Sequence, residues 1–148
     1  MKIWIVGARG AIASTLAVGA LAARRGLVPL EALLTETPPF RGLGLPALVD
    51  VEFGGCDLSP GTLADSAHEI LAGVGVFPVA MIDALMPDLE KIRITRGILR
   101  GGGPAIDALA GDQRAAGAAG SAREAVQRII DDIRAFADGQ PTVVVNLA

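Results

Sequence analysis

Two glycines near the start of the chain stand where an apolar segment ends. That segment is Lys2-Ile3-Trp4-Ile5-Val6, and Gly7-Ala8-Arg9-Gly10-Ala11-Ile12-Ala13 follows it. A turn between a strand and a helix presents main-chain amides and the positive end of a helix dipole to an anion. Gly7 can take turn dihedrals that a Cβ would forbid, and Gly10 lets a pyrophosphate approach the backbone closely. The segment predicts a nucleotide-phosphate site; a plain structural turn is the alternative.

The spacing of this turn differs from the commoner G-x-G-x-x-G, because Arg9 occupies the middle glycine position and the order becomes G-x-x-G-x-x-A. The pattern indicates a nucleotide site more specifically here because it lies directly after an apolar strand and before a helix. Two interpretations of Arg9 stay open: a charged contact to phosphate, or a solvated loop arginine. Ala13 is small enough for the helix to sit against the strand.

Two acidic residues are candidates for binding a ribose. An NAD-binding strand pair places an acid about 20 residues after the glycines, where it accepts hydrogen bonds from ribose hydroxyls. Glu36, at the end of a predicted second strand, is one candidate for this role, and a solvated acid at a strand end is the alternative interpretation. Asp57 is the second candidate, because it follows Phe53-Gly54-Gly55-Cys56, an arrangement that suits a tight turn or a ligand loop.

Other reactive side chains carry weaker signals. Cys56, the single cysteine, has no cation or histidine near it in sequence, which favours a small buried residue over a nucleophile. His68, the single histidine, is expected on a helix surface. One cysteine and one histidine argue against a structural zinc site, and no residue is assigned as a catalyst or a metal ligand.

Composition narrows the class of protein. The 148 residues are expected to form one domain, 1–148, and with 51% hydrophobic and 20% charged residues they suit buried strands covered by helices. The net charge of −3 argues against nucleic-acid binding. No segment reaches the roughly 20 apolar residues that span a bilayer, and Gly7 and Arg9 interrupt a stretch that otherwise resembles a signal peptide. The chain is expected to be cytoplasmic.

The predicted elements alternate, which indicates an α/β fold of the Rossmann-like type, a mostly parallel sheet with helices on both faces. Helices are expected at 11–25, from Ser59-Pro60 to 71, at 78–91, after Pro104, and from Ser121. The last of these begins with a capping box formed by Ser121 and Glu124 and ends at Gly139. Strands are expected at 30–37, at 48–53 closed by Gly54-Gly55, weakly at 91–95, and at 143–145 as a fully buried strand. Residues 115–120 are expected to be flexible. Because ligand contacts come from loops beyond strand ends, a chain that stops at Ala148 is expected to be a fragment.

Together these landmarks resemble the N-terminal part of the myo-inositol-1-phosphate synthase (inositol-3-phosphate synthase) family. Four pieces occur in the family's order: the glycine loop; V-E-F-G-G-C-D-L-S (51–59), similar to V-F-G-G-W-D-I-S; A-V-Q-R-I-I-D-D-I-R-A-F (125–136), similar to Q-Q-I-I-K-D-I-R-E-F; and V-V-V-N-L-A (143–148), similar to the strand before an N-T-E or S-T-E segment. The resemblance covers nearly the whole chain.

The resemblance implies an enzyme of inositol and phospholipid biosynthesis. The family converts D-glucose 6-phosphate to 1D-myo-inositol 3-phosphate by NAD-dependent oxidation, intramolecular aldol cyclisation and reduction. Its NAD contacts transfer to the following residues: Gly7, Ala8, Arg9, Gly10, Ala11, Asp57, Arg114, Leu147 and Ala148. General spacing favours Glu36 as the ribose acceptor, but the more specific F-G-G-C-D-L-S match favours Asp57, although Cys56 replaces the family's tryptophan.

The resemblance also implies what this chain should lack. The family's catalytic lysines and phosphate-binding residues lie in a later domain, so glucose 6-phosphate is expected to bind only with that domain, and homo-oligomers are expected of the longer protein. Two alternatives remain: a fragment of another NAD(P)-dependent dehydrogenase, and a non-catalytic nucleotide-binding module.

Overall fold

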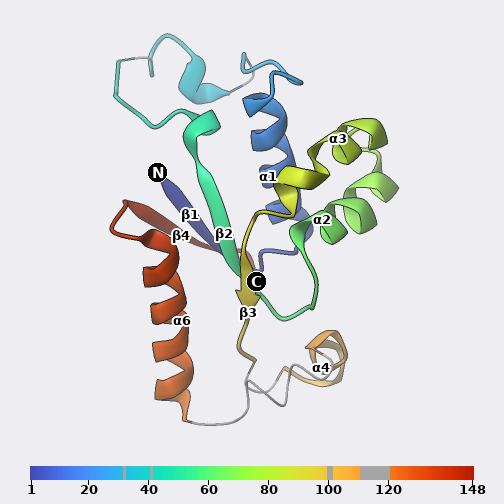
Figure 1. Ribbon diagram of the computed structural model, residues 1–148, viewed down its shortest axis with the longest axis vertical. Coiled ribbons are helices and arrows are strands. Elements are labelled where there is room, and N and C mark those ends of the chain that lie inside the picture. The colour runs from blue at the N-terminus through green and yellow to red at the C-terminus, as the bar shows by residue number, and fades with distance from the viewer. Residues whose placement is uncertain (32, 41, 100–101, 111–120) are drawn as a thin grey trace.

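A computed structural model describes residues 1–31, 33–40, 42–99, 102–110 and 121–148. Strands and helices alternate along the chain (Figure 1). The elements are β1 (Lys2–Val6), α1 (Ala11–Arg24), the 3-10 helices η1 (Leu34–Glu36) and η2 (Leu48–Asp50), β2 (Glu52–Asp57), α2 (Leu63–Ser66), the π-helical turn η3 (Ala67–Ala72), α3 (Val79–Leu89), β3 (Ile94–Arg96), α4 (Pro104–Ala110), α6 (Ala122–Ala137) and β4 (Thr142–Asn146).

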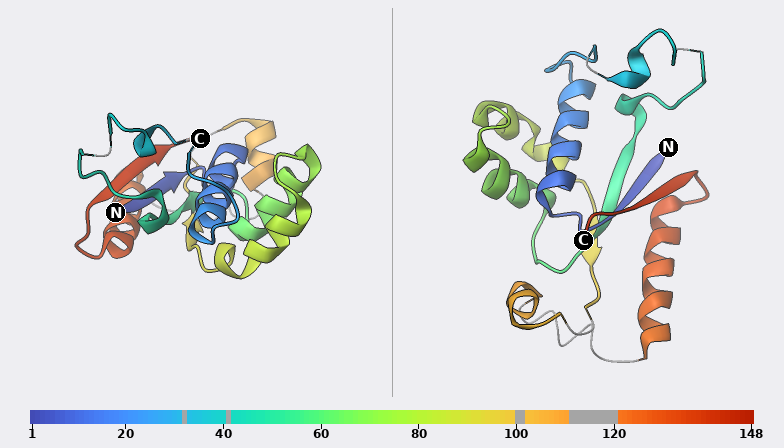
Figure 2. Two further views of the ribbon diagram at one scale, coloured as in Figure 1. Left: turned by 90° about the horizontal axis from the view of Figure 1, so that it is seen from above. Right: turned by 180° about the vertical axis from the view of Figure 1, so that it is seen from behind.

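The four strands form one parallel sheet in the order β3-β2-β1-β4. Val6 at the end of β1 pairs with Cys56 of β2 and Asn146 of β4, so the strands end at one edge. Helices cover both faces, with α1 on one and α6 on the other (Figures 1 and 2). The predicted Rossmann-like α/β fold is confirmed, and the edge where the strands end is the one that holds ligands in such sheets.

The larger core lies on the α1 face. Ile5 of β1 and Phe53 of β2 pack with Ala13 and Ala20 of α1. The opposite side of α1 packs against α2, η3 and α3 through a second cluster, formed by Ala17, Val18, Leu21, Ala22, Leu63, Ala64, Ala67, Leu71, Ile82, Leu85 and Leu89. Small alanines on both sides of α1 allow the helix to lie between the sheet and the outer helices.

Helix α6 covers the other face through one aromatic contact. The rings of Phe136 and Trp4 lie 5.5 Å apart between centroids, and a Cβ on Gly54 would lie 2.6 Å from the Phe136 ring. Lys2 Nζ donates to the Phe136 carbonyl at 2.8 Å, close to the end of α6. A Cβ on Gly55 would overlap the Ile5 carbonyl oxygen. The prediction that these two glycines close a strand is therefore wrong: they lie inside β2 because the close contacts require them.

The predicted strand at 30–37 is also wrong. The segment forms tight turns and η1, in which the amides of Leu33 and Glu36 donate to carbonyls three residues back, those of Leu30 and Leu33. Its leucine, alanine and glutamate residues are not β-branched, so local turns compete successfully with strand pairing. The strand that follows β1 in the chain is therefore β2, and it pairs with β1.

Several predicted boundaries shift while the elements persist. Helix α2 begins after Thr62 rather than at Ser59-Pro60, because Thr62 and Asp65 form a reciprocal capping box. The capping box of Ser121 and Glu124 is confirmed at the start of α6. The weak strand expected at 91–95 is β3, which begins at Ile94.

The last strand is less covered than predicted. Val143 and Val144 are 48% and 50% exposed, so β4 is not a fully buried strand. It lies at the edge of the sheet and pairs only with β1 among the described strands.

None of the helices in the described part of the chain is long and apolar enough to cross a membrane.

Candidate functional site

The glycine turn after β1 is built by bonds within the protein. Gly7 has a φ of +81°, the left-handed conformation that favours glycine. The amides of Gly7 and Ala8 both donate to the Cys56 carbonyl, at 3.0 and 3.1 Å, and the Gly10 amide donates to the Gly7 carbonyl at 3.1 Å. These three amides fix the shape of the turn, so the groups left for an anion lie further along the chain.

Those groups are the first amides of α1. Ala11, Ile12 and Ala13 begin the helix and have no carbonyl partner within it, and Gly10 as the N-cap offers no side-chain acceptor. Ala11 and Ile12 are exposed, and the first turn holds no acidic residue. A 14-residue helix directs its positive dipole end at this point. Of the five predicted loop residues, Ala11 therefore has the amide best placed for a phosphate.

Asp57 at the end of β2 lies next to this turn. Its Oδ2 accepts the Arg9 amide at 2.7 Å, and its Oδ1 accepts the Ser59 amide at 2.9 Å. A carboxylate has about four lone-pair positions, so two acceptor positions remain. Asp57 is also one of the residues that line a cavity. It is therefore fixed in orientation and still able to accept hydrogen bonds from a ligand's hydroxyl groups.

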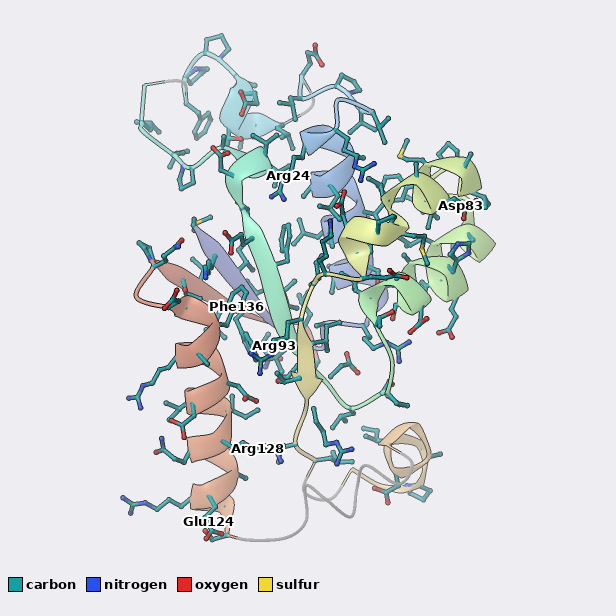
Figure 3. All side chains as sticks on the ribbon, viewed as in Figure 1. Arg24, Asp83, Arg93, Glu124, Arg128 and Phe136 are labelled. Atoms are coloured by element: carbon teal, nitrogen blue, oxygen red, sulfur yellow. The ribbon has the colours of Figure 1, made fainter. Side chains whose placement is uncertain are left out.

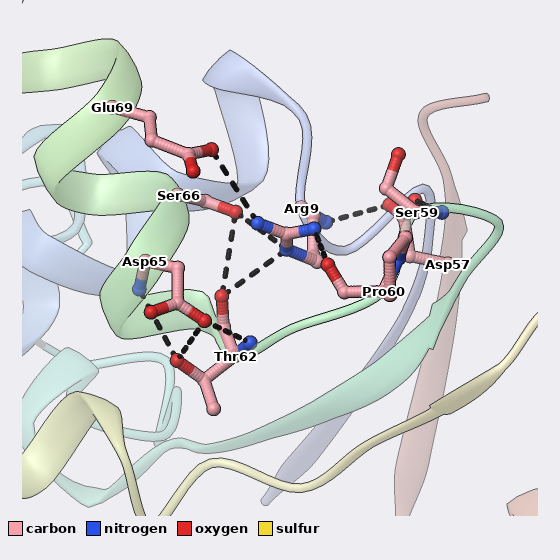
Figure 4. Close-up of polar contacts among 8 residues, drawn as sticks. All are labelled: Arg9, Asp57, Ser59, Pro60, Thr62, Asp65, Ser66 and Glu69. Atoms are coloured by element: carbon pink, nitrogen blue, oxygen red, sulfur yellow. Dashed lines mark hydrogen bonds and ion pairs between the residues drawn. The ribbon is translucent and has the colours of Figure 1, made fainter. Parts of the chain in front are cut away.

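Arg9 is not the solvated loop arginine of the second interpretation. Its guanidinium reaches the segment that follows β2, where Nε donates to Ser66 Oγ at 2.8 Å and to the Thr62 carbonyl at 3.2 Å (Figure 4). Its side chain is only 9% exposed. The arginine is thus buried, and it joins the turn after β1 to the segment after β2.

A mostly apolar cavity of about 350 Å³ opens at the same edge of the sheet. It is lined by Val6, Gly7, Cys56, Asp57, Leu58, Gly97, Ile98, Leu99, Ile106, Ile129 and Ala148. Arg128 of α6 donates to the carbonyls of Arg96 and Gly97, at 3.3 and 3.4 Å, and so ties the segment after β3 to that helix (Figure 3). A flat apolar ring attached to a ribose would suit a mostly apolar cavity that has one acid, Asp57, among its lining residues.

Cys56 is buried, as predicted for a structural residue. Burial raises the pKa of the Cys56 thiol, and the negative charges of Asp57 and Asp132 act in the same direction. The thiolate is disfavoured at neutral pH, and Cys56 forms part of the cavity wall.

Leu147 and Ala148 follow β4 and lie beside the glycine turn. The Leu147 amide donates to the Val6 carbonyl at 2.9 Å, and a Cβ on Gly7 would lie 3.1 Å from the Ala148 nitrogen. Strand order reverses between β1 and β4, which is the point where open α/β sheets bind ligands.

The other candidates lie elsewhere. Glu36 lies in η1, beyond the end of α1 and at the opposite end of the sheet from the glycine turn (Figure 1). Arg114 and residues 115–120 lie outside the described residues. His68 is exposed and pairs with Asp83 at 2.8 Å. No group of three or more potential metal ligands occurs among the described residues.

Sequence reasoning missed the apolar wall formed by Leu58, Ile98, Leu99, Ile106 and Ile129. These residues come from four segments of the chain, and only Leu58 belongs to one of the glycine or acidic motifs, V-E-F-G-G-C-D-L-S. A signal existed for Ile98 and Leu99, because apolar residues directly after a parallel strand lie at the ligand edge of the sheet.

The sheet order, the helix N-terminus at the switch point and the acid after β2 define a Rossmann-type α/β domain. In fold, the chain is similar to inositol-3-phosphate synthase from Caenorhabditis elegans, with a TM-score of 0.73 and 17% identity. The match covers 99% of this chain and 34% of that synthase, so the chain spans about a third of its length. No protein-family model and no curated protein sequence matches the chain.

Proposed function

We propose that this chain is the NAD-binding part of an inositol-3-phosphate synthase. One observation carries the proposal: the open N-terminus of α1, the Asp57 carboxylate and an apolar cavity meet at one edge of the sheet. These three features match the pyrophosphate, the ribose and the adenine of a dinucleotide in order. The family resemblance of the sequence and the similarity in fold to the nematode synthase support the same assignment.

Each part of NAD has protein groups suited to hold it. The amides of Ala11 and Ile12 would donate to the pyrophosphate, and Asp57 would accept from the adenosine ribose hydroxyls. The apolar walls at Leu58 and Ile98 would exclude water from the adenine ring. When bound, NAD supplies a hydride acceptor and donor. Because Leu147 and Ala148 lie beside Gly7, the end of β4 would lie next to the bound pyrophosphate.

The complete reaction on glucose 6-phosphate is assigned to the longer enzyme. The resemblance places the catalytic lysines and the phosphate-binding residues in a later domain, so residues 1–148 alone are expected to bind NAD without turnover. We infer that homo-oligomers and a cytoplasmic location likewise belong to the longer protein.

Calorimetric titration of NAD tests the proposal against an ordinary dehydrogenase fragment. Asp57→Asn removes a charged hydrogen-bond acceptor and should weaken NAD binding about tenfold or more. Glu36→Gln is the matched control and should leave the affinity within about twofold, because Glu36 lies at the opposite end of the sheet. Loss of binding in Glu36→Gln with retention in Asp57→Asn would favour the dehydrogenase. A wild-type chain that folds and binds no NAD would favour the non-catalytic module.

A further inference from the structure

Arg9 occupies a position that glycine commonly fills in dinucleotide-binding turns. Its side chain crosses from the turn after β1 to the segment after β2 (Figure 4). Nε donates to Ser66 Oγ and to the Thr62 carbonyl, Nη1 donates to the Pro60 carbonyl, and Nη2 lies 3.5 Å from Glu69 Oε2. All three guanidinium nitrogens are therefore engaged by one short segment, and hydrogen bonds from an ionised donor are stronger than neutral ones.

The segment also folds tightly around this guanidinium. Gly61 has a φ of +111°, and a Cβ there would lie 2.8 Å from Asp65 Oδ2 and 3.2 Å from the Arg9 guanidinium carbon. Asp65 in turn accepts from the Thr62 amide at 2.7 Å, within the capping box of α2. The backbone between β2 and α2 is thus shaped to receive the arginine.

The main-chain amide of Arg9 binds Asp57, the residue at the start of the same segment. Its amide donates to Asp57 Oδ2, while the Ser59 amide donates to Asp57 Oδ1. Ser59 adjoins Pro60, whose carbonyl accepts from the guanidinium. Arg9 therefore binds Oδ2 of Asp57 through its amide. Its guanidinium binds the backbone next to Ser59, whose amide holds Oδ1.

We propose that Arg9 is a positioning residue that orients the Asp57 carboxylate toward the ribose hydroxyls of the bound nucleotide. This inference rests on the proposed NAD-binding function. The guanidinium nitrogens of Arg9 are already bound by residues 60–69, so the role proposed for its side chain is to hold this segment. Without its side chain, the segment 58–62 loses its anchor, Asp57 rotates, and the site no longer distinguishes a ribose that carries its 2′-hydroxyl from one that lacks it.

The test compares two ligands rather than one affinity. NAD and its analogue lacking the adenosine 2′-hydroxyl are titrated into wild type, Arg9→Met, Asp57→Asn and the surface control Arg134→Met, whose residue lies on the exposed side of α6. Wild type and Arg134→Met should prefer NAD about tenfold, the affinity that one hydrogen bond to a charged group provides. In Arg9→Met and in Asp57→Asn the preference should fall below about threefold.

A milder pair of variants tests the idea if Arg9→Met does not fold. Ser66→Ala removes the hydroxyl that accepts from Nε, Glu69→Gln removes the negative charge beside Nη2, and both leave Arg9 in place. Their combination should lower the preference for the 2′-hydroxyl at least twofold. Arg9 variants that bind both ligands more weakly but keep the tenfold preference would overturn the inference. In that case Arg9 would stabilise the fold of the segment without orienting Asp57. Failure of wild type to bind NAD would overturn the proposed function instead, and this inference with it.

Discussion

The main-chain amide of Arg9 donates a 2.7 Å hydrogen bond to Oδ2 of Asp57, which joins the turn after β1 to the end of β2. The two residues are 48 positions apart in sequence, and the parallel pairing of β1 with β2 brings them together. The bond places a fixed carboxylate beside the open N-terminus of α1. Both halves of the proposed site, one for an anion and one for hydroxyl groups, depend on this relationship.

Gly7→Ala should destabilise the chain more than Gly26→Ala does. Both glycines have positive φ values, +81° and +67°, and this conformation costs an alanine about 1–2 kcal/mol. A Cβ at Gly7 would additionally press on the backbone of Leu147 and Ala148, whereas nothing lies within 4 Å of a Cβ at Gly26. Urea unfolding of both variants measures the difference. Equal losses of unfolding free energy would contradict the close approach of the β4 end to the glycine turn.

Gly54→Ala should be tolerated only when the Phe136 ring is removed. The added Cβ would lie 2.6 Å from that ring, and such overpacking typically costs about 1–3 kcal/mol. In a Phe136→Ala background the cost should fall below about 0.5 kcal/mol, because the space is then free. A double-mutant cycle in urea gives the coupling free energy. Additive effects would mean that α6 does not pack on β2 through this contact.

The sequence predicted the elements that local patterns specify. The helix from Ser121 has its capping box and apolar spacing within 16 residues, and α1 follows directly from the glycine turn. Asp57 was a candidate from its position after Phe53-Gly54-Gly55-Cys56, the resemblance favoured it over Glu36, and the structure brings it to the glycine turn. The strand role of Gly54 and Gly55 was missed because it depends on Phe136 and Ile5, which are distant in sequence. For the same reason nothing local indicated that Arg9 reaches Ser66.

Stability should depend on pH through Asp88. Hydrogen bonds from Arg25 and Lys91 hold the pKa of the Asp88 carboxyl below its ordinary value of 3.8. The ionised carboxylate therefore stabilises the fold above that ordinary value, and the stabilisation is lost as the pH falls through the lowered pKa. Asp88→Asn should lower the urea midpoint at pH 7 and leave less difference from wild type near pH 3. The exposed Asp50→Asn is the control, and an Asp88→Asn deficit that is unchanged at low pH would contradict the ion pair.

The Cys56 thiol should react slowly in the folded chain. Burial raises its pKa above the ordinary value of 9.0, so the thiolate population at pH 8 is small and sterically shielded. Alkylation by iodoacetamide, followed by mass spectrometry, should be at least about tenfold slower in buffer than in 8 M urea. Equal rates in the two solutions would show that the cavity wall at the end of β2 is open to solvent.

The proposed position of the pyrophosphate is tested most directly by titrating NAD into the isotope-labelled chain and following each amide signal by nuclear magnetic resonance. If the pyrophosphate binds at the start of α1, the amide signals of Ala11 and Ile12 should shift in a saturable way, together with those of Leu58 and Gly97 around the cavity. Glu36, at the opposite end of the sheet, should not shift. If saturation with NAD leaves the Ala11 and Ile12 signals unmoved, the pyrophosphate does not bind at the start of α1 and the proposed site is wrong.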